Sequence, residues 1–200
     1  MNSSRLTLIS HGATEAQHRA SFPLDEPVLK YEIGKIKELN WRTPTAAHVW
    51  SAPEQRTQQT SRALRLEFMV ADELRDCDYG RWRGRKMGDV QTEEKDGILT
   101  WLTHPSAVPH GGESLESLVG RAGKWMDEQR AVKHTIAVTH PAIIRAAVVY
   151  ALKIPVQTFW RIDIEQLTVT DLRFNSSVWT LRCSGCPLRK TRPGEEDVEG

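Results

Sequence analysis

Cysteine is scarce in this chain, which has three cysteines among its 200 residues. Three cysteines are too few, and odd in number, for the disulfide framework of a small secreted protein. We therefore expect a protein of the reducing cytoplasm. Cys183 and Cys186 have the C-x-x-C spacing of a zinc or redox site. Because no second pair accompanies them, we expect a simple turn there and no metal.

Long apolar runs and an excess of charge of one sign are also missing. No stretch approaches the roughly 20 apolar residues that a membrane-spanning helix needs. The opening MNSSRLTLIS is too short and too polar for a signal peptide. The formal net charge is +1, from 27 Lys and Arg against 26 Asp and Glu. We therefore expect neither a membrane nor a nucleic acid as partner.

Short apolar runs alternate along the chain with segments of helical periodicity. The apolar and β-branched runs predict strands at residues 6–10, 48–51 and 135–139. Helical spacing of apolar residues and good helix formers predict helices at residues 28–39, 53–68, 113–130 and 141–152. Two late runs of alternating polarity predict an antiparallel hairpin of residues 166–174 and 177–183.

This order of elements predicts one α/β domain. Strands that alternate with helices indicate a three-layer sandwich, with a mainly parallel central sheet, helices on both faces and an antiparallel C-terminal hairpin. A chain of this length can bury a sizeable core without metals or disulfides. We expect the domain to span residues 1–186. Residues 187–200, PLRKTRPGEEDVEG, hold few large apolar side chains, and we expect them to form a disordered tail.

Two histidines occupy equivalent places at the ends of predicted strands. LTLIS-His11-Gly12 and TIAVT-His140-Pro141 each run through a hydroxyl residue to a histidine and then to a residue that bends the chain. Ligands of open α/β sheets bind beyond the carboxyl ends of the strands, so neighbouring strands would bring both imidazoles to one crevice. Pro141 starts a helix whose N-terminus favours an anion. The spacing alone leaves a structural role for both histidines equally open.

Arg56 follows the short strand of residues 48–51 and can face the same crevice. An arginine fork recognises phosphate or carboxylate through two parallel hydrogen bonds. For Arg56 taken alone, a solvated arginine on a helix surface is the ordinary interpretation. Its place beside two strand-end histidines favours an anion site.

Five blocks of the sequence together resemble those of the histidine phosphatase superfamily, which is phosphoglycerate-mutase-like, in its phosphatase branch. The blocks are Ser10-His11-Gly12-Ala13-Thr14, Ser51 to Thr60, Leu74 to Gly84, Pro109 to Ser114, and Val138-Thr139-His140. They resemble, in order, the Arg-His-Gly-x-Thr motif, the Ser-x-Pro-x-x-Arg-x-x-Gln-Thr motif, the segment with the proton donor, and the two last motifs of the family. Any one block is weak evidence, but five in the right order form a specific signal.

The resemblance implies a phosphatase that needs neither cofactor nor metal. It implies His11 as the nucleophile that forms a phosphohistidine, with Arg56 and a protonated His140 as a clamp on the phosphoryl group. Asp76 stands at the position of the family's proton-donating glutamate. We expect one nitrogen of His11 to donate to backbone near Gly12, so that the other nitrogen is bare for attack.

Three further residues complete the expected site. Glu113 is the second candidate for the proton donor, or else a carboxylate that stabilises the first turn of its helix. Gln17 stands where the motif usually has asparagine. Ser10 stands where the family has arginine before its nucleophile. A hydrogen bond to a charged group is worth about 1.5–3 kcal/mol, so a pocket with serine there should hold phosphate less firmly.

Basic residues near this site offer a replacement for the missing arginine. The candidates are Arg19, Arg81, Arg83, Arg85 and Lys86. We hypothesise that one of them restores positive charge at the rim of the pocket. The alternative is an ordinary exposed basic turn.

We predict a metal-independent phosphomonoesterase that acts on a small phosphorylated metabolite. The alternative from another class is a phosphate-ligand or protein-binding module of the same fold with impaired catalysis, which Ser10 and Asp76 make credible. A mutase with a bisphosphorylated cofactor ranks lower, because the blocks are closely spaced. The substrate and the oligomeric state stay open.

Overall fold

The computed structural model describes residues 3–39, 41 and 47–188. Within them, six strands form one sheet in the order β3-β2-β4-β1-β5-β6. The strands are β1 (Ser3–Ser10), β2 (His48–Ser51), β3 (Met69–Val70), β4 (His134–Thr139), β5 (Thr168–Asn175) and β6 (Val178–Pro187). The first four run parallel to one another, and β5 and β6 pair antiparallel. The predicted parallel sheet with an antiparallel C-terminal hairpin is confirmed.

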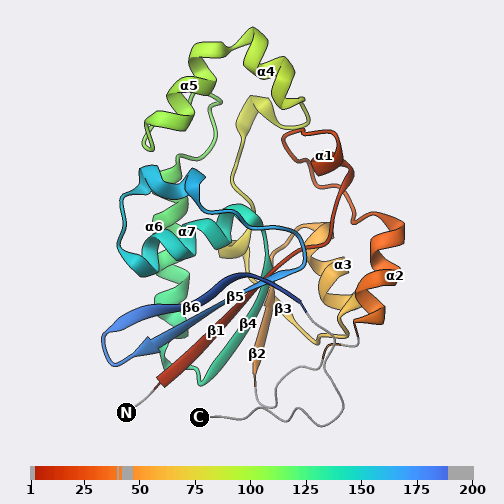
Figure 1. Ribbon diagram of the computed structural model, residues 1–200, viewed down its shortest axis with the longest axis vertical. Helices are drawn as coiled ribbons and strands as arrows, with labels where there is room; N and C mark the ends of the chain where they lie inside the picture. Colours follow the sequence, from red (N-terminus) through yellow and green to blue (C-terminus); the bar gives the residue numbers. More distant parts are fainter. Residues whose placement is uncertain (1–2, 40, 42–46, 189–200) are drawn as a thin grey trace.

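Helices cover both faces of this sheet. The α-helices are α1 (Glu15–His18), α2 (Lys30–Glu38), α3 (Gln55–Ala63), α4 (Met87–Glu93), α5 (Lys95–Thr103), α6 (Leu115–Glu128) and α7 (Pro141–Leu152). Short 3-10 turns are η1 (Asp72–Leu74), η2 (Gly80–Trp82), η3 (Gln129–Ala131) and η4 (Val156–Arg161). Figure 1 shows α6 and α7 on one side of the sheet, α2 and α3 on the other, and α4 with α5 in an arm that stands away from it.

The alternation of side chains along the central strands divides the hydrophobic core in two. Leu6 and Leu8 of β1 pack with the apolar side chains of α6 and α7. Ile9 of β1 and Ile136 and Val138 of β4 point the other way and pack with α2 and α3. Because successive residues of a strand face opposite sides of the sheet, each side receives its own layer of helices. The three-layer α/β sandwich is confirmed.

The pairing of the parallel strands decides where the site lies. Ser10 at the end of β1 pairs with Thr139 at the end of β4, and Ser51 at the end of β2 pairs with Val138. The backbone N–H of His11 then donates to the carbonyl of Thr139 at 3.1 Å. The residues that follow β1, β2 and β4 therefore meet at one edge of the sheet.

The arm has a small aromatic core of its own. We call Phe22, Trp82, Val90 and Trp101 the arm cluster; all four side chains are buried. The ring centroid of Trp82 lies 5.3 Å from that of Phe22 and 5.7 Å from that of Trp101. Trp101 also contacts Trp160 of η4, with 4.4 Å between centroids. Burial of these large rings attaches α4 and α5 to the rest of the molecule.

The C-terminal boundary differs slightly from the expected one. Pro187 pairs with Thr168 at the end of β6. Leu188 is buried, and its N–H donates to the carbonyl of Leu167 at 3.0 Å. The first two residues of the expected tail thus belong to the sheet and the core, and residues 189–200 lie outside the described residues. In the described part of the chain, no helix combines the length and the apolar character needed to cross a membrane.

Candidate active site

His11 follows β1 directly and is buried. Its Nδ1 lies 2.8 Å from the carbonyl oxygen of Gly12. A carbonyl only accepts, so the hydrogen sits on Nδ1 and Nε2 is the bare nitrogen. No described residue forms a hydrogen bond with Nε2. Burial lowers the pKa of His11 well below its usual value, and the charges of His140 and Arg56 lower it further, so the ring is neutral.

The turn after His11 is fixed by a glycine and a threonine. The N–H of Gly12 donates to Thr60 Oγ1 at 3.0 Å, and that hydroxyl donates to the carbonyl of Arg56 at 2.7 Å. A Cβ at position 12 would lie 2.9 Å from Ile36 Cδ1 and 3.0 Å from Val28 Cγ1. Glycine is therefore the residue that fits, and Thr60 joins the histidine turn to the helix that carries Arg56.

Arg56 lies in the first turn of α3, with 2% of its surface exposed. One of its terminal nitrogens, Nη1, donates to the carbonyl of Leu24 at 2.7 Å. The other, Nη2, donates to Asp76 Oδ2 at 2.8 Å. This ion pair is nearly dry, since the side chain of Asp76 is 13% exposed. The guanidinium is thereby held in one position at the sheet edge.

His140 precedes the first turn of α7 and is fully buried. Its ring centroid lies 5.2 Å from that of His11, edge to face, so the two predicted histidines do come together. Its Nε2 lies 2.8 Å from Glu54 Oε2. Its Nδ1 lies 3.5 Å from Asp76 Oδ2 and makes no hydrogen bond to a described residue. The ring of His140 thus lies next to two carboxylates, those of Glu54 and Asp76.

Glu54 is a site residue that sequence reasoning missed. Besides His140, it binds the loop of Asp76, because its Oε1 accepts from the N–H of Asp76 at 3.0 Å. Burial raises the pKa of Glu54, but the hydrogen bond and charge of His140 and the N–H of Asp76 outweigh this and lower the pKa to about 2. The carboxylate is therefore ionised at neutral pH. The available signal was an acidic residue between a strand end and Arg56.

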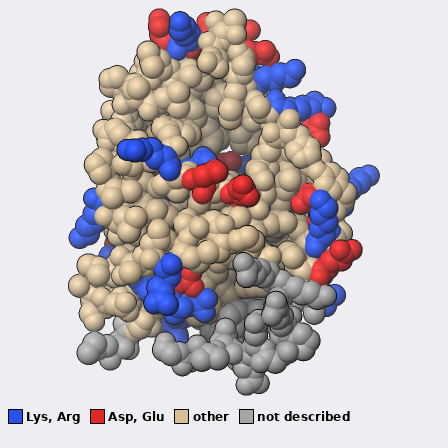
Figure 2. Space-filling model, viewed as in Figure 1, with Lys and Arg blue, Asp and Glu red and all other residues tan. Residues whose placement is uncertain are grey.

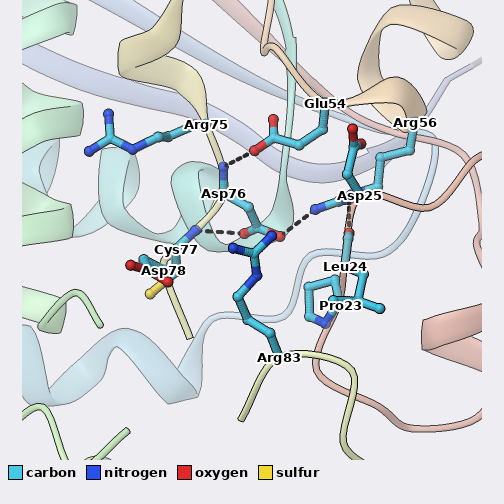
Figure 3. Close-up of a pocket in the computed structure, with 10 residues that line it drawn as sticks. All are labelled: Pro23, Leu24, Asp25, Glu54, Arg56, Arg75, Asp76, Cys77, Asp78 and Arg83. Carbon is cyan, nitrogen blue, oxygen red and sulfur yellow. Dashed lines mark hydrogen bonds and ion pairs between the residues drawn. The ribbon is translucent and has the colours of Figure 1, made fainter. Parts of the chain in front are cut away.

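Asp76 lies two residues beyond η1, at the centre of this set of polar groups. Its Oδ2 accepts from Arg56, and its Oδ1 accepts from the N–H of Cys77 at 2.9 Å. Figure 3 shows the hydrogen bonds that join its carboxylate to Arg56 and to the N–H of Cys77. Asp76 is therefore the carboxyl group that the fold brings closest to both Arg56 and His140, among the residues that sequence analysis singled out.

Two cavities adjoin at Arg56 and Asp76. The first, which we call the Arg83 cavity, has a volume of about 240 Å³. Its wall consists of Pro23, Leu24, Asp25, Glu54, Arg56, Arg75, Asp76, Cys77, Asp78 and Arg83 (Figure 3). The second, the His11 cavity, has a volume of about 420 Å³. Its wall includes His11, Thr14, Gln17, Arg56, Asp76 and Arg145. Figure 2 shows acidic side chains beside the hollow on this face of the molecule, with basic side chains next to them.

Gln17 and Ser10 differ in their relation to these cavities. Gln17 lines the His11 cavity, and its Oε1 accepts from the N–H of Thr14 at 3.0 Å in the cap of α1. Ser10 has no exposed surface and lies in the wall of neither cavity. Its Oγ has no hydrogen-bond partner among the residues that the structure describes. Position 10 thus supplies no polar group to the cavity.

Glu113 is not brought into either wall. Both oxygens of its carboxylate accept from Arg121, at 2.9 and 2.7 Å. Arg121 also donates to the carbonyl of Asp76 at 3.3 Å, so Glu113 supports the Asp76 loop from outside. The first turn of α6 is capped by another residue, Ser114, whose Oγ accepts from the N–H of Ser117 at 3.1 Å.

The described residues contain no group of three or more His, Cys, Asp or Glu side chains that could hold a metal ion. The polar groups around His11 instead contact one another, Arg56 with Asp76 and His140 with Glu54. A neutral imidazole with a bare nitrogen, an arginine fork and a nearby carboxyl group can receive, hold and release a phosphoryl group.

A family model described as the histidine phosphatase superfamily, branch 1, matches residues 6–186. The chain belongs to this superfamily. The predicted family is thereby confirmed. The matched residues cover nearly the whole described domain, from within β1 to near the end of β6.

Relatives of this histidine phosphatase are distant in sequence. The bifunctional protein Rv2228c of Mycobacterium tuberculosis is 30% identical over 132 residues, which cover 62% of this chain and 36% of that protein. The chain thus spans little more than a third of the length of this relative. Phosphoserine phosphatase 1 of Hydrogenobacter thermophilus is 28% identical over 121 residues, which cover 56% of this chain and 57% of that protein.

The fold is also that of solved phosphatases. The mycobacterial glucosyl-3-phosphoglycerate phosphatase Rv2419c, solved in complex with VO3, superposes with a TM-score of 0.81 at 22% identity. The superposition covers 92% of this chain and 99% of that one. At this identity the likeness concerns the fold.

Proposed function

We propose that this histidine phosphatase is a metal-independent phosphomonoesterase that hydrolyses a small phosphorylated metabolite through a phosphohistidine on His11. The observation that carries the proposal is the hydrogen bond from His11 Nδ1 to the Gly12 carbonyl, which leaves Nε2 bare in a ring kept neutral by burial. A neutral imidazole nitrogen is the form that can attack phosphorus.

In the first step, Nε2 of His11 attacks phosphorus, an N–P bond forms, and the P–O bond to the alcohol breaks. The leaving oxygen takes its proton from the carboxyl group of Asp76. In the second step, water gives a proton to Asp76 and attacks phosphorus, a new P–O bond forms, and the N–P bond to Nε2 of His11 breaks, so that phosphate and free His11 are released. The same carboxyl group thus serves both steps, which divides one difficult displacement into two easier ones.

The ion pair of Arg56 with Asp76 fits this cycle. An arriving phosphoryl group offers oxygens to Nη2 of Arg56 in place of Asp76 Oδ2, since both are anions that suit a guanidinium. The displaced carboxylate then lies beside a phosphate anion, and like-charge repulsion favours its protonated form. Binding of the substrate would in this way convert Asp76 into the acid that the leaving group needs.

The remaining groups suit the charge of a transferring phosphoryl group. Nδ1 of His140 has no hydrogen bond to a described residue and lies 3.5 Å from Asp76 Oδ2, so it can donate to a phosphoryl oxygen that takes the place of this carboxylate. The N-terminus of α7, a helix of 12 residues, lies beside it and favours an anion. The volume of the His11 cavity, about 420 Å³, suits a small metabolite. The similar proteins include a phosphoserine phosphatase and a glucosyl-3-phosphoglycerate phosphatase, and their names support this substrate class.

The test is to trap the intermediate. Wild-type protein and His11→Ala are mixed with a reactive aryl phosphate labelled in the phosphoryl group and quenched in alkali, where phosphohistidine survives. We expect an acid-labile label on His11 in the wild type, none in His11→Ala, and release of phosphate by the wild type alone. Equal background rates from both proteins, with no label, would instead favour the phosphate-binding module of impaired catalysis.

A further inference from the structure

Arg56 and His140, the basic groups next to His11, already have carboxylate partners. Arg56 is paired with Asp76 at 2.8 Å, and His140 is hydrogen-bonded to Glu54 at 2.8 Å. Ser10, where the family has an arginine, is buried outside both cavity walls. A phosphate monoester brings close to two negative charges at neutral pH. A further cation would therefore strengthen the hold of the site on a phosphorylated substrate.

Three of the five basic candidates are occupied by glutamates. The ion pairs are Arg81 with Glu94 at 2.6 Å, Arg85 with Glu94 at 2.6 Å, and Arg19 with Glu15 at 2.7 Å. Lys86 is exposed and lies in the wall of neither cavity. These four side chains do not meet the phosphoryl site in this structure.

Arg83 is the exception. It lies in the wall of the Arg83 cavity together with Arg56 and Asp76. Figure 3 shows its side chain extending over the part of this cavity where Arg56 and Asp76 lie. It makes no hydrogen bond or ion pair with any residue that the structure describes, so its five N–H donors are free.

The backbone around Arg83 is held firmly while its side chain is free. The preceding residue, Trp82, is fully buried in the arm cluster. The following residue, Gly84, has φ +77°, a value that favours glycine, and its N–H donates to the carbonyl of Phe22 at 2.9 Å. This turn places one unpaired guanidinium in the wall of the Arg83 cavity, which shares Arg56 and Asp76 with the His11 cavity.

We propose that Arg83 binds the phosphoryl group of the substrate and replaces the arginine that Ser10 lacks. The inference rests on the proposed function for the site, and it assigns to a residue of the arm the charge that relatives take from the end of β1. When a phosphoryl oxygen replaces Asp76 as the hydrogen-bond partner of Arg56, the guanidinium of Arg83 binds the same phosphoryl group from the side of the Arg83 cavity. Phosphate is thus gripped by two arginines from different parts of the fold.

The test measures phosphate binding without turnover. Inorganic phosphate is titrated calorimetrically into the wild type, Arg83→Gln and the matched control Lys86→Gln, which removes a charge from the same turn outside the cavities. A lost hydrogen bond between charged groups should weaken binding roughly 10- to 100-fold in Arg83→Gln. The control should bind phosphate as the wild type does. Equal affinities for all three proteins would overturn the inference, as would the absence of phosphate binding in the wild type.

Chemical rescue separates a binding role from a structural one. In Arg83→Ala, added guanidinium ion, well below denaturing concentrations, should restore phosphate affinity, because the ion can occupy the vacated space. A variant that binds weakly only because its turn is distorted would not be rescued, and that outcome would also refute the inference. The result can also refute the proposed function alone. If the protein binds phosphate through Arg83 but forms no phosphohistidine, the catalytic mechanism is wrong and the binding role of Arg83 still holds.

Discussion

Replacement of Glu54 by glutamine should remove a defined part of the pH dependence of stability. The carboxylate is 18% exposed and its pKa is lowered from 4.5 to about 2, chiefly through His140 against the opposing effect of burial. A group with a lowered pKa stabilises the folded state above its unfolded pKa, and this contribution is lost as pH falls through the folded pKa. At about 1.4 kcal/mol per pH unit, the loss amounts to roughly 3 kcal/mol between pH 4.5 and 2.

Urea unfolding, followed by circular dichroism at several pH values from neutral to about pH 2.5, measures this contribution. In the wild type, the free energy of unfolding should fall steeply over the acid range. In Glu54→Gln it should start lower at neutral pH and fall less, since glutamine does not titrate. Glu67→Gln, at an exposed glutamate, controls for the general loss of a carboxylate. The same acid slope in wild type and Glu54→Gln would show that His140 does not hold this carboxylate ionised.

Three other predictions concern the nucleophile, the acid and the packing of α6. The lowered pKa of His11 keeps its ring neutral below its usual titration range, so kcat/KM should persist below pH 6 and fall only as pH drops through the lowered pKa; a fall centred near pH 6.5 contradicts this. Asp76→Asn should reduce kcat about 100-fold or more for alkyl phosphates and far less for aryl phosphates with good leaving groups, and equal losses for both would exclude it as the acid. Gly123→Ala should lower the urea-unfolding free energy by roughly 1–3 kcal/mol, because its Cβ would lie 2.3 Å from the Tyr150 ring. Gly120→Ala, where nothing lies within 4 Å, should raise it by about 0.5–1 kcal/mol, and a shared sign would refute the packing argument.

Strong periodic patterns predicted the central fold well. The helix of residues 141–152 and the strand of residues 48–51 have the predicted bounds, because buried apolar runs leave little choice of conformation. The arm was not predicted. Leu99 and Leu102 of α5 are 58% and 42% exposed, so the apolar residues of this helix do not mark one buried face, and its few buried rings serve a small local core.

The sequence predicted the positions of those site residues that directly follow the central strands. His11, Arg56 and His140 follow three strands whose pairing brings their ends together, so strand order was sufficient. Glu54 was missed because its partner His140 is 86 residues away in the sequence, and a carboxylate in a turn is ordinarily solvated. Arg121 donates to the carbonyl oxygens of Glu73 and Arg75, and sequence spacing does not reveal these contacts because the packing of α6 against η1 creates them.

The arm cluster gives the molecule an intrinsic optical reporter. Trp101 stands 4.4 Å from Trp160 and 5.7 Å from Trp82, measured between ring centroids. Indole rings at such separations share their electronic excitation, which produces a paired positive and negative band in circular dichroism. Trp82 directly precedes Arg83 in the chain. A displacement of the arm during a catalytic cycle would therefore change this band pair, and no attached dye would be needed to detect it.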